Sequence, residues 1–362
     1  MLYSMDLNLR VNISEFMISV HMQSLVPKIP LLAVLMFLAA TPLEAQNLTV
    51  RTDASTSSNG ITDFSIGSNT LKLGTTGDLQ SVASDLSLQA KHTLNSVRIL
   101  DQDGNELLSI DKQLDNEDGS TRIYALNNGA FIIREVISNF DIYDSFGNLD
   151  YSIKNNTNSP GGESVSELAT DPMGRTVVVY NPKIVISGRN ESRASMITAS
   201  GERKEFFYSN SSPIRDVQVS RDGNYISVIA ENNTVYLFDR YGNKLNEISF
   251  NQDIIGSRFS DNGRYVCIYS TGRAGVYSVI SGQREGSTSF RATVRAARYF
   301  PEDNTILAIT GERGGNTLSD IEFHAINVSA RKIARSKFNG VLGINDQIPL
   351  HFGRTGSGSY NL

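Results

Sequence analysis

A glycine-containing turn recurs along this chain at intervals of 40 to 49 residues, and this repeat constrains the fold more than any other feature. Each copy joins a short strand-like segment to an apolar run. The copies read NNGAFIIREV, DPMGRTVVVY, SRDGNYISVIA and SDNGRYVCIYS, with their glycines at Gly129, Gly174, Gly223 and Gly263. A degenerate copy, FPEDNTILAI, places Asp303 another 40 residues on. A period of this length indicates a repeat architecture in which each repeat is one supersecondary unit.

A second kind of turn alternates with the first and follows strand-like segments that end in aspartate. Its copies are VRILDQDGNEL, FDIYDSFGNLD and VYLFDRYGNKL, in which Asp101, Asp144 and Asp239 each stand three residues before a glycine. Looser copies surround Gly201 and Gly282. Glycine and asparagine reach positive φ at low cost, so turns of this kind close tight hairpins. An aspartate just before such a turn can accept a backbone N–H and stabilise it.

The runs between the turns predict strands that are covered on both faces. YISVIA, YVCIY and TVVVY are apolar at every position rather than at alternate positions. Repeats of four short antiparallel strands, with a middle strand buried on both sides, predict the blades of a β-propeller. We therefore expect an all-β fold of four-stranded antiparallel blades.

The number of blades follows from how many repeats can be placed. Six are recognisable; the first has Ser84-Asp85 as its turn, and the last runs from about Val294 to Phe338. Residues 47–74 and 339–352 contain further strand-like pieces, and together they could form a blade closed by both ends of the chain. We predict seven blades, with six as the alternative.

One segment carries a resemblance to known proteins. SRDGNYISVIAENNTVYLFDRYGNKL, which begins at Ser220, resembles a repeat of the WD40-like, YVTN-like and periplasmic TolB-type propellers, and the resemblance spans most of Asp78 to Phe338. These propellers include scaffolds, binding modules and enzymes, so the resemblance implies architecture and little chemistry. The chain has no Trp-Asp dipeptide, no Gly-His pair and no tryptophan, which argues against quinone-cofactor dehydrogenases with tryptophan-stapled blades.

An apolar segment near the N-terminus predicts export. Leu31 to Ala40 is too short to span a bilayer, which needs roughly 20 residues. Lys28 precedes it and the small residue Ala45 follows it, in the order of a secretory signal peptide. Met22 would start a conventional signal, so we interpret the residues before it as an over-long start.

These features predict three regions: a signal peptide over 1–45, a single propeller domain over 46–352, and a flexible Gly/Ser-rich tail over 353–362. The exported protein would be periplasmic, extracellular or associated with the cell surface. We expect no transmembrane helix after signal cleavage, and a monomer.

Composition excludes several classes of function. The formal net charge of −5 gives no basic surface for nucleic acid. A single cysteine excludes an internal disulfide and a cysteine-rich metal site, and Cys267, in the middle of the run YVCIY, is expected to be a core residue. His324 lies within the strand-like run IEFHAIN and is expected to be a satisfied core or edge histidine. No cofactor or metal is expected.

The segment Asp101-Gln102-Asp103-Gly104-Asn105 resembles a calcium loop only superficially. An EF-hand loop needs glycine after its third ligand and glutamate at position twelve, where this chain has Glu106 and Lys112. The same pattern recurs in other repeats, which favours a turn.

The candidate binding residues are arginines in the later repeats. In a propeller, the connections after the second and fourth strands share one end of the molecule, opposite the glycine turns. Four arginines fall there: Arg273, Arg291, Arg295 and Arg313. Converging guanidinium groups would favour a carboxylate or an acidic partner, whereas the alternative is that they solvate an exposed rim. Two long loops predicted at the same end, 181–193 and 155–163, make it the expected interaction surface.

The leading hypothesis is an exported, non-catalytic propeller that binds another protein or a cell-envelope polymer through this end. The alternative is a propeller hydrolase or lyase acting on a small acidic or saccharide substrate in the central channel. In that case arginines would orient a carboxylate, and Glu167 or Asp216 would supply acid–base chemistry. These two carboxylates occupy equivalent positions, seven residues before Gly174 and Gly223. This alternative requires both of them and Arg295 to line one channel.

Overall fold

Six antiparallel sheets, each built on four strands, make up most of the chain that the structure describes. The structure is a computed structural model, and the residues it describes are 5–12, 49–56, 63–66, 69–72, 78–114, 121–135, 139–153, 166–186, 189–198, 200–315, 317–328, 332–338, 340, 342–343, 353–354 and 360–361. Among these residues no helix has the length and apolar character needed to cross a membrane. The predicted all-β fold is confirmed.

The strands of each sheet lie side by side in chain order. The first three sheets contain β5 (Asp78–Val82), β6 (Leu88–His92), β7 (Ser96–Asp101) and β8 (Glu106–Asp111); β9 (Arg122–Ala125), β10 (Phe131–Glu135), β11 (Asn139–Tyr143) and β12 (Leu149–Ile153); and β13 (Glu167–Thr170), β14 (Val177–Ile186), β15 (Arg189–Ile197) and β16 (Arg203–Ser209). The last three contain β17 (Ile214–Val219), β18 (Tyr225–Ala230), β19 (Thr234–Asp239) and β20 (Lys244–Ser249); β21 (Ile254–Phe259), β22 (Tyr265–Ser270), β23 (Arg273–Ser278) and β24 (Arg284–Ser289); and β25 (Val294–Phe300), β26 (Thr305–Gly314), β27 (Thr317–Asn327) and β28 (Lys332–Phe338).

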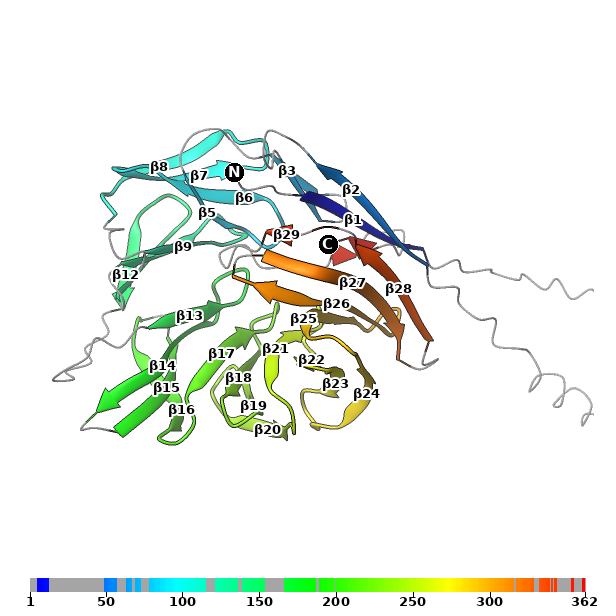
Figure 1. Cartoon of the computed structure of the whole chain (residues 1–362). Helices are drawn as coiled ribbons and strands as arrows, with labels where there is room; N and C mark the ends of the chain where they lie inside the picture. Colours follow the sequence, from blue (N-terminus) through cyan, green and yellow to red (C-terminus); the bar gives the residue numbers. More distant parts are fainter. Residues whose placement is uncertain are drawn as a thin grey trace, which may run out of the picture.

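The six sheets are arranged around a common axis as the blades of a propeller (Figure 1). The first strand of each blade is the innermost: β5 contacts β9, β13 contacts β17, β17 contacts β21, and β21 contacts β25. We call the six first strands, β5, β9, β13, β17, β21 and β25, the inner strands. The fourth strands lie at the periphery (Figure 1). The predicted β-propeller architecture is therefore confirmed.

The described residues contain six blades, which matches the six-blade alternative. The pieces assigned to a seventh blade pair as short two-stranded sheets: β3 (Asp63–Ile66) with β4 (Asn69–Lys72), and β2 (Thr49–Thr56) with β1 (Met5–Asn12). β2 also lies beside β28, and β29 (Leu342–Gly343) adds to the edge of β27. Residues 344–352 of the predicted seventh blade lie outside the described residues.

The predicted signal segment and the predicted tail lie near the two ends of the chain. The predicted signal segment, 22–45, lies outside the described residues, and cleavage after Ala45 would also remove β1 from its pairing with β2. Within the predicted tail, β30 (Gly353–Arg354) pairs with β31 (Tyr360–Asn361).

The predicted turns form as expected. The nine turn glycines that the repeat identifies all have positive φ, between 66° and 88°. In the two turns that lack glycine, Leu86 in the first blade and Asn304 in the sixth take this conformation, with φ of 61° and 50°. The N–H of the positive-φ residue donates to the carbonyl three residues earlier, as Gly223 does to Ser220, except that Gly282 donates to Ser278, four residues earlier. One backbone geometry thus closes the first hairpin of every blade.

The hydrophobic core lies between blades. In β18, Ile226 and Val228 pack toward the third blade, with Tyr180 and Phe207, while Ile229 packs toward the fifth, with Ile254 and Ile268. Similar clusters join the first blade to the second, the second to the third, and the fifth to the sixth. A strand whose two faces serve two interfaces must be apolar at every position, which is the pattern of YISVIA.

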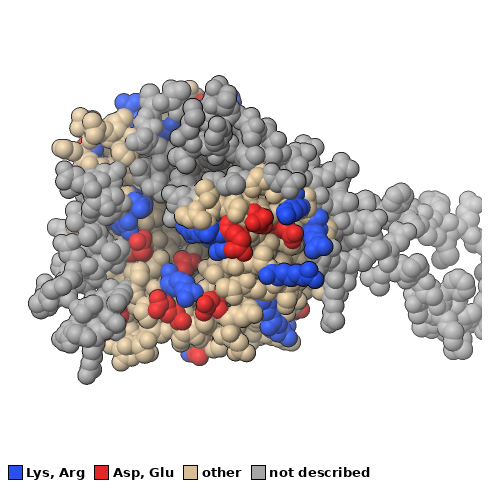
Figure 2. Space-filling view, in the orientation of Figure 1, with Lys and Arg blue, Asp and Glu red and all other residues tan. Residues whose placement is uncertain are grey.

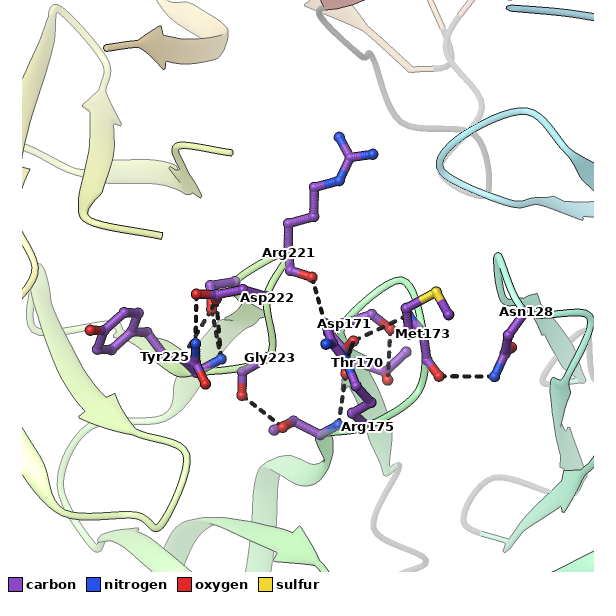
Figure 3. A network of polar contacts seen from close by, with 12 residues as sticks. Asn128, Thr170, Asp171, Met173, Arg175, Arg221, Asp222, Gly223 and Tyr225 are labelled. Carbon is purple, nitrogen blue, oxygen red and sulfur yellow. Dashed lines mark hydrogen bonds and ion pairs between the residues drawn. The ribbon is translucent and has the colours of Figure 1, made fainter. Parts of the chain in front are cut away.

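The turns between first and second strands are linked from blade to blade into what we call the turn belt (Figure 3). Asn128 donates to the carbonyl of Met173, Arg175 to that of Arg221, and the Thr176 hydroxyl to that of Gly223. The chain of contacts continues through an ion pair of 3.2 Å between Arg221 and Asp261. We call this side of the propeller the turn end, and the opposite side the hairpin end.

The predicted loop over 181–193 is wrong as a loop, because most of it is β-structure. Strands β14 and β15 run on past the blade and pair out to Ile186 and Arg189. Pro182 has no N–H to donate to the ladder, and a bulge between Asn181 and Ile184 accommodates it. The other predicted loop, 155–163, lies outside the described residues.

Candidate functional site

The four predicted binding arginines all belong to the hairpin end of the fifth and sixth blades. Arg273 begins β23 and donates to the Ser287 hydroxyl at 2.9 Å, whereas Arg291 is exposed in the connection to β25. Arg295, the second residue of β25, donates to the carbonyl of Gly311 at 2.8 Å, and Arg313 donates to that of Gly315 at 3.1 Å. Each bonded arginine is held by its own blade. Their role in binding stays a prediction.

The predicted core residues lie where the sequence places them. Cys267 is fully buried, and burial raises the pKa of its thiol to about 12. His324 is buried, its Nε2 lies 3.0 Å from the Thr310 hydroxyl, and its ring packs edge-on against Phe290. Burial also lowers the pKa of His324. Both residues are structural, as predicted.

The calcium-like segment is a turn, as predicted. One oxygen of Asp101 accepts the backbone N–H groups of Asp103 and Asn105, and the other accepts the Asn105 side-chain amide. Asp144 and Asp239 repeat these three bonds in their own turns. Across the described residues, no group of three or more histidine, cysteine or acidic side chains is arranged to hold a metal ion.

Glu167 and Asp216 lie at equivalent points of the inner strands, as predicted. Glu167 pairs with Tyr180 of β14, and Asp216 pairs with Ile229 of β18. Both carboxylates are partly exposed. In the next blade the equivalent residue is Gly256, which pairs with Tyr269. Around the inner wall, carboxylates in the third and fourth blades are therefore followed by a position without a side chain in the fifth.

The inner strands of the fourth, fifth and sixth blades carry a bulge directly after their first residue, and β5 of the first blade carries one between Leu79 and Ser81. The register shifts between Ile214 and Asp216, and it shifts at the same place in β21 and β25. In these three later blades the bulged residues are Arg215, Ile255 and Arg295. A bulge redirects the side chain of its extra residue and often lies beside a functional site. Arg215 uses this freedom to reach the next blade, where it donates to the carbonyl of Ile254.

A hydrogen-bonded group of side chains, which we call the Asp216 cluster, joins the inner strands β17 and β21. Gln218 donates to Asp216 at 2.8 Å, and Arg258 donates to the carbonyl oxygen of the Gln218 amide at 2.7 Å. The Arg258 guanidinium also hydrogen-bonds the Tyr269 hydroxyl. Tyr180, whose hydroxyl lies near Asp216 without a hydrogen bond to it, completes the cluster of Tyr180, Asp216, Gln218, Arg258 and Tyr269.

The absence of a side chain at Gly256 brings Tyr269 to the inner wall. A Cβ atom at Gly256 would lie 2.4 Å from the Tyr269 hydroxyl oxygen, a distance that no real pair of these atoms shows. The tyrosine ring therefore occupies the volume that a side chain on β21 would fill. Burial raises the pKa of Tyr269, the Arg258 charge opposes this effect, and the Asp216 charge adds to it.

Tyr180 approaches Asp216 from the third blade. Its side chain is buried, with 8% of the residue exposed, and its hydroxyl has no hydrogen-bond partner among the described residues. Burial raises the pKa of Tyr180, and the charges of Asp216 and Glu167 raise it further. The hydroxyl thus lies near both carboxylates and remains available to a ligand.

A buried ion pair anchors Glu167 beside this cluster. Arg134 of β10, only 4% exposed, lies 2.8 Å from the Glu167 carboxylate and donates to the carbonyl of Ser166. Tyr124 of β9 is close to this pair, and burial raises its pKa to about 12, with a further contribution from Glu167. The pair balances its own charge, so Glu167 brings little net charge to the inner wall.

Asp216 itself is unusual because it is partly exposed and yet surrounded by protein on most sides. Burial raises the pKa of its carboxyl, against the opposing effects of the Gln218 hydrogen bond and the Arg258 charge. A carboxyl with a raised pKa can donate as well as accept a hydrogen bond. Together with tyrosine hydroxyls and a guanidinium, it can bind a polar ligand or exchange a proton with one.

The molecule is hollowed around its axis, and charges of both signs lie beside the hollow (Figure 2). Basic and acidic side chains alternate there instead of forming a patch of one sign (Figure 2). This mixture suits a ligand recognised by individual contacts rather than by a uniform electrostatic field.

Sequence reasoning found both carboxylates but missed the side chains around them. Gln218 and Arg258 occupy equivalent positions, five residues before Gly223 and Gly263, so the repeat alignment held a signal for them. Tyr180 and Tyr269 were read as core residues of apolar runs. Only the pairing of Tyr269 with Gly256 reveals that its hydroxyl reaches the inner wall.

Comparison with known proteins identifies the fold and nothing more specific. No family model matches the chain, and no curated protein matches it. Among solved structures, one described as a crystal structure of the eukaryotic initiation factor superimposes with a TM-score of 0.53 and 14% sequence identity. It covers 82% of this chain and 74% of that chain. At this identity the likeness shows the propeller-like fold alone.

Proposed function

We propose that the chain is an exported, non-catalytic β-propeller that holds another protein or a cell-envelope polymer at its hairpin end. The observation that carries this proposal is the pair of extended hairpins there. Strands β14, β26 and β27 have 10, 10 and 11 residues, whereas the equivalent β18, β19 and β22 have six each. Projecting segments on a rigid scaffold are where repeat proteins commonly bind their partners.

The side chains at the hairpin end suit a partner with acidic groups. Arg273, Arg291, Arg295 and Arg313 come from two adjacent blades and the connection between them. At the base of the β14–β15 hairpin, Tyr208 is 47% exposed, and the Arg193 guanidinium lies 5.2 Å from its ring centre. Arginine and tyrosine are enriched among the residues that dominate binding energy at protein interfaces.

The turn belt supports a binding role because it joins the blades at the turn end, whereas the hairpins at the opposite end can vary. Hydrogen bonds between turns hold successive blades together at the turn end. The hairpin end carries the long hairpins, whose length and sequence can change without breaking the belt. A scaffold of this kind presents variable segments in fixed relative positions.

A crosslinking pull-down from envelope and secreted fractions tests the docking surface. The bait is the purified chain, compared with a variant in which Arg273, Arg291, Arg295 and Arg313 are changed to alanine. The matched control removes the same charge at the turn end through Arg203, Arg240, Arg264 and Arg284. We expect one discrete partner with the wild type and the control, and its loss with the hairpin-end variant. A partner retained by the hairpin-end variant would move the surface elsewhere.

Export is tested by fractionating cells that express the full chain and sequencing the N-terminus of the product. Cleavage after Ala45 gives a chain that starts at Gln46 and lacks β1. A product that stays in the cytoplasm with residues 5–12 in place, and protected from amide exchange by pairing with β2, contradicts export.

The Asp216 cluster favours a second candidate function, a hydrolase or lyase that acts on a small substrate at the inner wall. Asp216 of the cluster and the neighbouring Glu167 would supply the acid and base, and Arg258 would orient the substrate. Arg295, which this idea assigned to the same task, instead bonds the Gly311 carbonyl of its own blade. A turnover that Asp216→Asn and Glu167→Gln abolish in a folded protein would establish an enzyme. Turnover unaffected by both changes removes this candidate.

A further inference from the structure

We propose that the Asp216 cluster is a binding site for a small carboxylate ligand, at the seam between the inner strands β17 and β21. This inference concerns a different part of the molecule from the docking surface proposed above, and it does not depend on export or on a protein partner. It names the chemical class of ligand that the side chains of the inner wall would recognise.

The first argument is the supply of hydrogen-bond donors with no acidic partner. Arg258 bonds a glutamine oxygen and a tyrosine hydroxyl, and Arg215 bonds the carbonyl of Ile254. Neither guanidinium is ion-paired with a carboxylate among the described residues. A guanidinium has five N–H donors, so both arginines keep donors for a ligand. An arginine with N–H donors that no carboxylate of the protein contacts directly is suited to an anionic ligand.

The second argument is the charge of the inner strands. The six inner strands β5, β9, β13, β17, β21 and β25 together contain five arginines and three acidic residues. This excess of positive charge occurs in a chain whose formal net charge is −5. The inner strands are therefore more positive than the chain as a whole, even though one of these arginines, Arg298, is ion-paired with Asp261.

The third argument is that hydroxyl and carboxyl groups can complete the contacts of a carboxylate. The Tyr180 hydroxyl, at the end of a largely buried side chain, has no hydrogen-bond partner among the described residues, and it can donate to an incoming oxygen. Asp216 would repel the ligand if both were ionised. Two carboxyl groups held close together share one proton, because both cannot be ionised at low cost. The ligand would therefore bind together with a proton on Asp216, and affinity would fall as pH rises.

Isothermal titration of the full chain tests the site with acetate, succinate and galacturonate, at constant ionic strength and from pH 5 to pH 8. Galactose serves as the neutral counterpart of galacturonate. We expect at least one carboxylate to bind, tighter at pH 5 than at pH 8, and galactose not to bind. Titrations in two buffers of different ionisation enthalpy should show uptake of protons on binding.

Four variants separate a binding role from a structural one. Arg258→Ala should weaken binding about tenfold or more, since it removes charge-assisted hydrogen bonds. Tyr180→Phe should weaken it several-fold. Asp216→Asn should keep binding and abolish its pH dependence, because asparagine donates as the protonated acid does. Arg264→Ala, an exposed arginine of the turn end, should change nothing. Circular dichroism and melting curves establish folding, and Arg258→Lys replaces the alanine variant if that variant does not fold.

Three results would overturn the proposal. The first is no heat of binding for any of the three carboxylates up to about 10 mM. The second is equal binding of galactose and galacturonate, which would indicate a neutral polyhydroxyl site. The third is binding that keeps its pH dependence in Asp216→Asn, or that is unaffected by the Arg258 variants. A failed pull-down at the hairpin end affects none of these measurements, so the two proposals fail separately.

Discussion

Gly256 shows how a single residue decides what the inner wall of the propeller presents. Equivalent positions in the third and fourth blades hold Glu167 and Asp216, and a side chain at Gly256 would exclude Tyr269 from the wall. The glycine has no unusual φ, so its role is to leave room rather than to reach a special backbone conformation. The Asp216 cluster depends on this missing side chain.

Replacement of Gly256 by alanine should destabilise the protein by about 1–3 kcal/mol, because the new methyl group overlaps the Tyr269 hydroxyl and forces the ring to move. Urea unfolding followed by circular dichroism measures the change. Gly272→Ala is the control, since its nearest neighbour is a carbonyl oxygen at 3.5 Å, and it should stay within about 0.5 kcal/mol of the wild type. Equal effects of the two substitutions would contradict the overlap.

The turn aspartates make stability depend on pH at the acidic side. A hydrogen bond from Asn105 lowers the pKa of Asp101, and one from Asn148 lowers the pKa of Asp144. A carboxyl whose pKa is lower in the folded state stabilises the fold above its unfolded pKa of about 3.9, and this contribution is lost as pH falls toward the folded value.

The variant Asp101→Asn/Asp144→Asn should therefore lose less stability than the wild type between pH 5 and pH 3, while being less stable at pH 7. Urea unfolding at the three pH values provides the comparison. Asp150→Asn, an exposed residue of β12, should keep the pH dependence of the wild type. A double variant with an unchanged pH profile would show that the turn carboxyls do not contribute.

At the scale of elements, the turn belt converges on Asp261. Arg221 of the fourth blade and Arg298 of the sixth both bond one of its carboxylate oxygens. Arg298 lies on an inner strand and is 21% exposed, whereas Arg221 is 53% exposed. The Asp261–Arg298 contact is therefore the better shielded of the two ion pairs.

Asp261→Ala should cost about 1–3 kcal/mol, because it removes hydrogen bonds between charged groups and leaves the less exposed Arg298 without this acceptor. Arg221→Ala should cost no more than about 1 kcal/mol, as expected of an exposed ion pair. Thermal unfolding of both variants measures the difference. Equal losses would mean that the belt does not depend on Asp261 as a shared acceptor.

The elements that could be predicted from the sequence are those that local chemistry specifies. Turn glycines, turn aspartates and fully apolar strands each have a local physical cause, and their order along the chain gives the blades. The β14–β15 hairpin was missed because its outer part exceeds the repeat and has no counterpart in the other blades with which to align, and pairing continues there past a bulge. The tyrosines of the Asp216 cluster were missed because their role depends on contacts between strands and blades.

At the scale of the whole molecule, every described neighbouring pair of blades from the first to the sixth shares a hydrophobic cluster. The described end pieces lie at the junction between the sixth blade and the first: β2 lies beside β28, and Lys72 of β4 pairs with Asp103 of the first blade. Blade number depends on how this last interface closes, and no local pattern in the sequence specifies it. For this reason six and seven blades both remained open before the structure was known.

Amide hydrogen exchange should show whether the junction between the sixth blade and the first is less stable than the other interfaces between blades. We expect the slowest exchange in β18 and β22, whose strands are buried on both faces, and faster exchange in β5 and β28 next to the closing interface. Mass spectrometry of peptic fragments gives the comparison. Uniform protection in all six blades would mean that the ring closes as firmly there as elsewhere.

The turn belt has a direction, and its direction bears on how such a molecule can grow. From the second blade to the fourth, side chains of the earlier blade donate, and backbone carbonyls of the later blade accept. Any sequence supplies a backbone carbonyl, so a duplicated blade inserted in this stretch would be joined without a matching substitution in its neighbour. Gene duplication can thus lengthen this part of the array one blade at a time. The link at Asp261 differs, because this side-chain acceptor needs an arginine in each of the two flanking blades.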